Sequence, residues 1–254
     1  MAGDESGKLK LWDVTTGSPI WNVNADHVIS VAFSPNGRAV LSGSANRTLT
    51  LRDLRTGRPI RTFTGHSWPV TSVAFSSDGN FVLSGAFDDP DLSGTGETPG
   101  RGRGEVKLWD VATGTVIHTF TEHSGSVKSV AFSPDDRLVL AGDDNVMTLW
   151  DRASGHLIHT FSGNSMAVES VAFSPEDRLI LAGSSDHIVT LWDTIAGRPI
   201  RTFAEHSFPV SSVTISPDGS LALSGGFDSE SVDGHGGGDL KLWEVGYRAK
   251  QEFG

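Results

Sequence analysis

The chain has 254 residues, 31 acidic against 20 basic residues, and a formal net charge of −11. This charge opposes binding to a phosphate backbone, so we expect no nucleic-acid partner. The chain contains no cysteine, which excludes disulfides and thiolate metal sites and is compatible with the cytoplasm. No apolar run approaches the roughly 20 residues that span a bilayer, so we expect no membrane partner and a cytoplasmic location.

The first residues are expected to belong to an incomplete repeat. Residues 1–7 are similar to the end of a loop, and strands are expected at 8–14 and 19–23. The clearest complete unit covers residues 123–163, where alternating apolar and polar residues and Pro, Asp and Gly turns predict four strands. These strands are expected at residues 126–133, 137–141, 146–151 and 157–161. Four short strands joined by tight turns are typical of an antiparallel propeller blade.

Two phrases recur about every 40 residues, which is the period of a repeat architecture. The phrase Lys/Thr-Leu-Trp-Asp/Glu occurs at residues 10–13, 107–110, 148–151, 190–193 and 241–244, with Arg52 replacing the Trp at 50–53. The phrase Ser-Val-Ala-Phe-Ser occurs at residues 30–34, 72–76, 129–133 and 170–174, and becomes Ser-Val-Thr-Ile-Ser at 212–216. Function is therefore expected where the copies differ.

On these two phrases the chain resembles the WD-repeat β-propeller family, in particular its regular bacterial-type arrays. The resemblance implies an all-β fold of four-stranded antiparallel blades, with about six repeats and irregular ring closure. We expect a single domain over residues 1–254. The predicted repeat cores are residues 8–23, 28–63, 70–120, 127–161, 168–203 and 210–245.

The resemblance also implies a buried hydrogen-bond relay in each blade, formed by a His, a Ser or Thr, a turn Asp and the Trp. A buried indole and a buried imidazole each need a partner, so these residues are expected to be structural. The relay residues present are His66, Ser84 and Trp109; His206, Ser224 and Trp243; His123, Asp144 and Trp150; and Asp186 and Trp192. The first two sets lack an Asp at the expected turn spacing.

The extra length of the chain lies between the second and third strands of two repeats. These inserts, residues 87–104 and 227–239, are rich in Asp, Gly, Ser, Thr and Pro, and are predicted to be loops. Their acidic residues raise the possibility of calcium binding, but the spacing is not that of an EF-hand, so we expect no metal and no cofactor.

Large apolar side chains stand beside these inserts, at positions where the repeat needs none. The candidate partner-binding residues are Trp68, Met166, Phe208, Phe87, Asp88, Phe227 and Asp228. An exposed cluster of aromatic residues and Met is typical of a contact surface. The alternative is that the long loops fold over these side chains.

We therefore expect a non-catalytic scaffold that binds a protein or peptide partner, in keeping with the family's frequent attachment to signalling domains. The alternatives are peptide or glycan recognition of a lectin-like kind and, less favoured, an enzyme. No P-loop and no Ser-His-Asp spacing supports catalysis.

The two ends of the chain do not complete a common blade. The sequence is compatible with part of a seven-bladed ring, a six-bladed ring with one incomplete blade, or self-association of two chains through open edges.

Overall fold

The computed structural model describes residues 2–3, 7–87, 104–121, 125–163, 166–228 and 237–246. Every regular element in these ranges is a β-strand, and none is a helix long and apolar enough to cross a membrane. The chain divides into two compact units, Met1–Val168 and Glu169–Gly254. The strands form antiparallel sheets, which confirms the predicted all-β class with four-stranded antiparallel blades.

The first unit contains one three-stranded sheet followed by three four-stranded sheets. The three-stranded sheet is β1 (Ala2–Gly3), β2 (Lys8–Trp12) and β3 (Pro19–Asn24). The next is β4 (Val28–Phe33), β5 (Ala39–Ser44), β6 (Thr48–Asp53) and β7 (Pro59–Thr64). The third is β8 (Val70–Phe75), β9 (Phe81–Phe87), β10 (Gly104–Asp110) and β11 (Val116–Phe120). The fourth is β12 (Ser129–Phe132), β13 (Leu138–Gly142), β14 (Val146–Asp151) and β15 (Leu157–Ser162).

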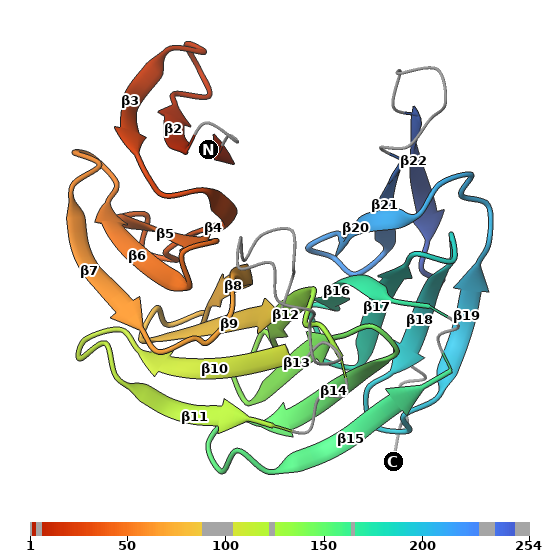
Figure 1. Cartoon of the computed structure of the whole chain (residues 1–254). Coiled ribbons are helices and arrows are strands. Elements are labelled where there is room, and N and C mark those ends of the chain that lie inside the picture. Colours follow the sequence, from red (N-terminus) through yellow and green to blue (C-terminus); the bar gives the residue numbers. More distant parts are fainter. Residues whose placement is uncertain are drawn as a thin grey trace, which may run out of the picture. The chain divides into compact units, whose positions relative to one another are not determined.

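The second unit contains one four-stranded and one three-stranded sheet. The first is β16 (Val168–Phe173), β17 (Leu179–Ser184), β18 (Val189–Asp193) and β19 (Pro199–Phe203). The last is β20 (Val210–Ile215), β21 (Leu221–Asp228) and β22 (Gly237–Glu244). Strands follow one another in chain order within each sheet, and within the first unit the leading strands β4, β8 and β12 lie next to one another (Figure 1).

The recurring serine and aspartate shape two kinds of turn. Ser34 Oγ accepts a hydrogen bond from the Ala39 N–H at 2.9 Å and so closes the turn between β4 and β5. Equivalent bonds are made by Ser76, Ser133, Ser174 and Ser216. Asp53, which ends the third strand, accepts a hydrogen bond from the Thr56 N–H at 2.8 Å. The repeated phrases therefore encode turn geometry as well as strands.

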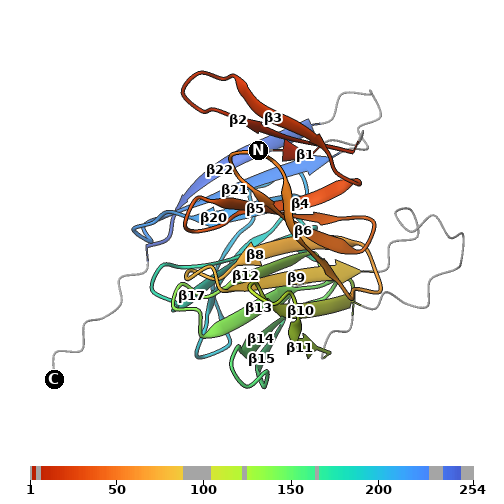
Figure 2. The same cartoon turned by 90° about the vertical axis from the view of Figure 1, so that its left-hand side faces the viewer.

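Successive sheets pack together where two valines of one sheet contact a glycine of the preceding sheet. A Cβ at Gly43 would lie 2.6 Å from Val70 Cγ1 and 2.9 Å from Val73 Cγ1, so only glycine leaves room there. A bulge between Val70 and Ser72 turns the two valines to the same face, although they are three residues apart. Leu41 and Leu49 become fully buried beneath them. Figure 2 shows the four-stranded sheets of the first unit as successive layers.

Polar bonds between neighbouring sheets accompany this packing. Ser30 Oγ accepts a hydrogen bond from the Val73 N–H at 3.1 Å, and Ser72 and Ser170 make the same bond to Val130 and Val213. On the outer strand, Arg61 donates to the carbonyls of Ala112 and Thr113 in the next sheet at 2.7 and 2.8 Å. Trp21, His118 and Arg201 make the equivalent contact from their own sheets.

Strand pairing corrects three predicted loop boundaries. Phe87 pairs with Gly104, so the ends of the first predicted insert are strand. The pairs Phe227–Gly238 and Asp228–Gly237 shorten the second insert in the same way. Ala2–Gly3 pairs with β2, where a loop was expected. Backbone hydrogen bonds continue between two strands as long as the strands stay side by side. Composition alone does not show where the strands separate.

Candidate functional site

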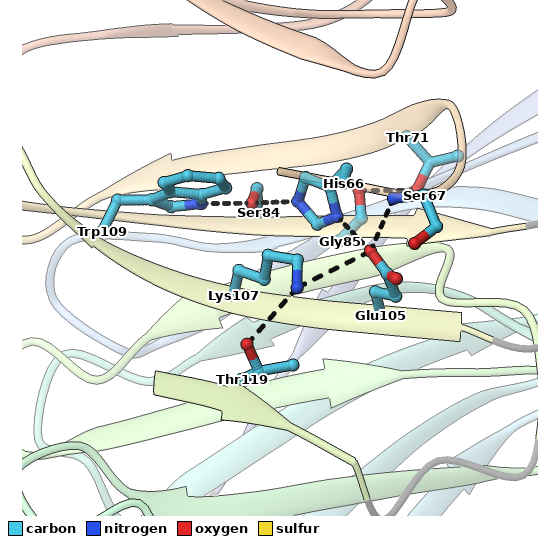
Figure 3. Close-up of polar contacts among 9 residues, drawn as sticks. All are labelled: His66, Ser67, Thr71, Ser84, Gly85, Glu105, Lys107, Trp109 and Thr119. Atoms are coloured by element: carbon cyan, nitrogen blue, oxygen red, sulfur yellow. Dashed lines mark hydrogen bonds and ion pairs between the residues drawn. The ribbon is translucent and has the colours of Figure 1, made fainter. Parts of the chain in front are cut away.

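A chain of hydrogen bonds crosses the sheet β8–β11 from the buried tryptophan to an acidic residue (Figure 3). Trp109 Nε1 donates to Ser84 Oγ at 2.7 Å, and Ser84 Oγ lies 2.6 Å from His66 Nε2. His66 Nδ1 lies 2.9 Å from Glu105 Oε2. Because the serine oxygen already accepts from the indole, its proton goes to Nε2, and a neutral imidazole donates its Nδ1–H to Glu105.

The charge at the end of this relay is held by Glu105. Its Oε2 also accepts the Ser67 N–H at 3.0 Å and lies 3.8 Å from Lys107 Nζ (Figure 3). Burial alone would raise the pKa of Glu105, but hydrogen bonds from His66 and Ser67 and the charge of Lys107 lower it from 4.5 to about 2. Burial lowers the pKa of His66 below its ordinary 6.5. The relay therefore pairs a neutral histidine with an ionised glutamate at neutral pH.

The same relay recurs in the second unit, in the sheet β20–β22. Trp243 Nε1 donates to Ser224 Oγ at 2.8 Å, and Ser224 Oγ lies 2.6 Å from His206 Nε2. His206 Nδ1 lies 2.6 Å from Asp239 Oδ1, and Asp239 Oδ2 accepts the Ser207 N–H at 3.0 Å. Burial would raise the pKa of Asp239, but these hydrogen bonds and the charges of His206 and Lys241 lower it.

Sequence reasoning assigned six of these relay residues but missed the two carboxylates. The expected turn aspartate is absent, and its place is taken by Glu105 and Asp239, which lie near the start of the strand after each insert. Each stands four residues before the relay tryptophan and two before a lysine. This spacing, Glu-Val-Lys-Leu-Trp and Asp-Leu-Lys-Leu-Trp, was the signal that could have identified them.

The order serine, histidine and carboxylate is also that of a hydrolytic triad, but the relay does not have the properties of one. Ser84 and Ser224 are buried, so their hydroxyls do not face solvent. Each hydroxyl oxygen accepts an indole N–H, which lowers its ability to attack a substrate. The arrangement satisfies buried polar groups and ties the third strand to the connection that precedes the first.

The remaining predicted relay residues are placed only in part. His123 lies outside the described residues. Asp144 Oδ2 accepts the Ser126 N–H at 2.9 Å, which orders the approach to β12, and Trp150 is fully buried. Asp186 accepts hydrogen bonds from Ser184 Oγ and from the Ile188 N–H at 3.3 Å, within its own turn, and Trp192 is buried.

Four of the seven candidate contact residues are aromatic and lie in two places, one in each unit. The Phe87 N–H donates to the Pro69 carbonyl at 3.2 Å, which brings the end of β9 beside Trp68. The Phe227 N–H donates to the Pro209 carbonyl at 3.0 Å, beside Phe208. We call Trp68 with Phe87, and Phe208 with Phe227, the two aromatic pairs. Each pair stands directly before an insert and beside a relay histidine.

The exposure of these side chains differs. Phe227 is 54% exposed and Met166 is 53% exposed. Trp68, Phe87 and Phe208 are half-buried. Lys128 Nζ lies 4.3 Å from the centroid of the Phe87 ring, and a Cβ at Gly237 would lie 2.4 Å from Phe208 Cζ. Phe87 therefore packs against a residue of the following sheet and Phe208 against its own sheet, while Phe227 is largely exposed.

The structure does not describe most of the acidic residues of the two inserts. Asp88 and most of both inserts lie outside the described residues, as does the side chain of Asp228. Within the described ranges, no group of three or more His, Cys, Asp or Glu side chains could hold a metal ion.

The chain matches the family model WD40 (WD domain, G-beta repeat) over residues 17–53, 57–89, 114–151, 155–193 and 197–243. It is similar to nuclear distribution protein PAC1 of Coccidioides posadasii (strain C735), with 28% identity over 145 residues, 54% of this chain and 31% of that protein. Angio-associated migratory cell protein of Homo sapiens is 27% identical over 143 residues, 55% of this chain and 29% of that protein. The chain thus spans less than a third of the length of these curated relatives. The family match covers most of the chain, which belongs to the WD40 repeat family, and its sheets are the blades of a WD-repeat β-propeller.

Proposed function

We propose that this chain is a non-catalytic scaffold that binds protein or peptide partners through its two aromatic pairs. WD40 repeat proteins generally act as protein-interaction scaffolds. The observation that carries the proposal is the partial exposure of Phe227 beside Phe208, repeated by Phe87 beside Trp68. Aromatic residues are enriched where proteins bind one another, because they bury a large area with few rotatable bonds.

The architecture keeps these pairs in a fixed position. The backbone bonds at Pro69 and Pro209 fix the end of the second strand, and the relay fixes the connection that carries Trp68 and Phe208. A contact residue held in place before binding loses less conformational entropy when the partner arrives. The repeat thus provides rigidity, and the aromatic side chains provide the contact.

The charge around the pairs indicates the chemistry of the partner. Asp88 and Asp228 follow the second aromatic residue of each pair directly in the sequence, and the whole chain carries a net charge of −11. A partner segment with an apolar anchor flanked by Lys or Arg would complement both features. We further propose a cytoplasmic, signalling-related setting, which fractionation of the source cells would test.

Matched aromatic substitutions test the contact surface. In Trp68→Ala combined with Phe208→Ala, and separately in Phe227→Ala, we expect cross-linked partners recovered from the source lysate to be lost. Phe33→Ala is the control, because Phe33 is 51% exposed and ends the first strand of its sheet, beside the turn to the second strand. Unchanged capture by the aromatic-pair variants, with circular dichroism showing a folded protein, would contradict the proposal.

The same aromatic rings are suited to stacking on a sugar, which keeps peptide or glycan recognition as the second candidate. Parallel peptide and glycan arrays distinguish the two. Binding confined to glycans, and lost in Phe227→Ala but retained in Phe33→Ala, would replace the protein-scaffold proposal with a lectin-like one.

A further inference from the structure

The sheet β4–β7, drawn in red to orange in Figure 1, carries three exposed arginines at one end of its strands. Arg38 lies in the turn between β4 and β5, and Arg55 and Arg58 lie in the turn between β6 and β7. We call these three residues the arginine cluster. Successive connections of an antiparallel sheet leave it at opposite ends, so the cluster lies at the end of the strands that carries no insert and no aromatic pair.

The backbone holds the two turns side by side. The Leu54 N–H donates to the Arg38 carbonyl at 2.9 Å, and the Asp53 N–H donates to the Arg58 carbonyl at 2.9 Å. Neighbouring strands are about 4.8 Å apart, so the backbones of Arg38 and Arg58, two strands apart, are separated by about 10 Å. The arginine cluster therefore occupies a small area of surface on a fixed backbone.

The charge at this end of the sheet is opposite to that of the other four-stranded sheets. The two turns of β4–β7 contain three arginines against one aspartate. The equivalent turns of β8–β11 contain two aspartates and no basic residue, and those of β12–β15 and β16–β19 each contain two arginines against three acidic residues. The turns compared are, in chain order, residues 34–38 with 53–58, 76–80 with 110–115, 133–137 with 151–156, and 174–178 with 193–198.

The absence of one carboxylate leaves Arg38 without an acidic partner. In the sheet β12–β15, Asp135 accepts the Arg137 N–H at 2.9 Å and also lies 4.0 Å from Arg137 Nε. Asn36 takes the place of Asp135 and accepts the Arg38 N–H at 3.0 Å, so the turn is preserved without the negative charge. Within the part of the chain that the structure describes, the side chains of the arginine cluster form no hydrogen bond or salt bridge.

The one aspartate of these turns is already engaged. The carboxylate of Asp53 accepts the hydroxyl of Thr56 at 2.6 Å and its N–H at 2.8 Å. These hydrogen bonds, aided by the charge of Arg55, lower the pKa of Asp53. Asp53 therefore offsets one of the three positive charges and leaves the guanidinium groups accessible. A guanidinium group binds a carboxylate through two parallel N–H bonds, so neighbouring free arginines form a site for acidic groups.

The small extent of the arginine cluster favours a short acidic segment over a long polyanion. A Cβ at Gly79 would lie 3.4 Å from Pro35 Cδ, so the acidic turn that contains Asp78 is directly adjacent. A nucleic-acid strand carries closely spaced phosphates along its whole length and would extend over this acidic neighbour. An extended peptide spans about 10 Å with about three residues, so its acidic side chains can be limited to the cluster.

We propose that the arginine cluster binds an extended acidic segment of a protein partner, with two or more Glu or Asp residues within about four consecutive positions. This contact is additional to the aromatic pairs and opposite to them in charge preference, because the pairs are followed by Asp88 and Asp228. It does not depend on the function proposed above, since it concerns other residues at the other end of the strands.

A labelled peptide of alternating Glu and Gly tests the proposal by fluorescence anisotropy at low salt. Replacing the arginine cluster, in Arg38→Gln with Arg55→Gln and Arg58→Gln, should weaken binding about tenfold, since each exposed charge pair contributes modestly. The matched control is Arg137→Gln with Arg178→Gln and Arg198→Gln, which removes the same charge from exposed positions in equivalent turns and should keep most of the affinity. A peptide with Gln in place of Glu should not bind.

Asn36→Asp provides a second variant that retains all three arginines. An aspartate can accept the hydrogen bonds that Asn36 accepts from Ser34 Oγ and the Arg38 N–H, as Asp135 does in its own turn. The fold should therefore be kept, which thermal unfolding followed by circular dichroism would check. The new carboxylate should compete for Arg38 and weaken peptide binding about threefold.

Four outcomes would overturn the proposal. One is the absence of peptide binding by the unaltered chain. Another is an equal loss of affinity in the two triple variants, which would assign binding to the overall charge. Tighter binding of a single-stranded oligothymidylate that is lost in the cluster variant would assign the arginines to nucleic acid. A dimer in light scattering that becomes a monomer in the cluster variant would assign them to a second copy of this chain.

Discussion

Asp136 accepts two hydrogen bonds from Ser77, one from its N–H at 2.8 Å and one from its hydroxyl at 2.6 Å, across 59 residues of sequence. Asp136 has a φ of 59°; of the four corresponding turns, three carry Gly37, Gly79 and Gly219, and the fourth carries Asp177, also with a φ of 59°. Ser77 stands where the other four turns have Pro35, Pro134, Pro175 and Pro217, which have no N–H. Ser77 alone replaces the turn proline, and it lies opposite one of the two turns that carry Asp in place of Gly.

This pairing predicts a large coupling energy between the two positions. Ser77→Pro leaves the buried carboxylate of Asp136 without two donors and should lower the free energy of unfolding by about 1–3 kcal/mol. Adding Asp136→Gly should restore most of the loss, because Gly79 packs on Pro35 in the neighbouring turn. Denaturant unfolding of the two single variants and the double variant measures the coupling. Additive losses would show that the two residues act independently.

Removing the indole donor should weaken the relay without disturbing packing greatly. Trp109→Phe leaves Ser84 without its indole partner inside the sheet, and we expect a loss of about 1–2 kcal/mol in the free energy of unfolding. Trp12→Phe is the control, since Trp12 is more than a third exposed. Equal losses in the two variants would argue that ring size, and not the hydrogen bond, determines stability.

The relay should also make stability depend on pH. Glu105 has a pKa of about 2 in the folded chain against an ordinary 4.5, so its contribution is complete above pH 4.5 and is lost as the pH falls toward about 2. The lowered pKa of His66 acts in the same direction below pH 6.5. In Glu105→Gln, unfolding free energies measured across this range should vary less with pH. Glu244→Gln makes the same charge change on an exposed residue and should retain the parental slope.

Two glycines at equivalent positions should respond oppositely to the same substitution. Gly183→Ala forces a Cβ against Val210 and should cost about 1–3 kcal/mol through overpacking. At Gly225 an added Cβ would make only an ordinary contact, with Leu240 Cδ1 at 3.9 Å, so Gly225→Ala should stabilise the chain by about 0.5–1 kcal/mol, because alanine loses less backbone entropy in a strand. Thermal unfolding followed by circular dichroism measures both. Destabilisation by Gly225→Ala would show that other atoms pack against this position in solution.

The repeat could be predicted from the sequence because each copy has the same residues at the positions that form its turns and strands. Ser34 and Asp53 act within a few residues of themselves, so their phrases predicted turns and strands directly. Glu105 was missed because its partner His66 lies 39 residues away, across an insert that breaks the usual spacing. Composition placed the ends of the inserts in loops, yet Phe87 and Gly104 are paired. No local pattern encodes such long-range partners.

Contacts between blades were the least predictable part of the candidate surfaces. Nothing in the neighbourhood of Asp136 indicates that it meets Ser77. Likewise, the sequence around Leu240 predicts an ordinary buried strand residue, because the equivalent Leu49 and Val189 are buried. Their difference in exposure depends on whether another blade packs against the sheet, and the sequence of a single repeat does not specify its neighbour.

The pairing of Phe87 with Gly104 has a practical consequence. Because the ladder closes at that pair and Glu105 anchors the strand just beyond it, neither the backbone pairing nor the relay specifies the length of the chain between them. The pair Asp228–Gly237 and the anchor Asp239 do the same in the second unit. Foreign peptides can therefore be inserted between these paired residues. The two blades are suited to peptide display, and their binding specificity can be changed without redesigning the propeller.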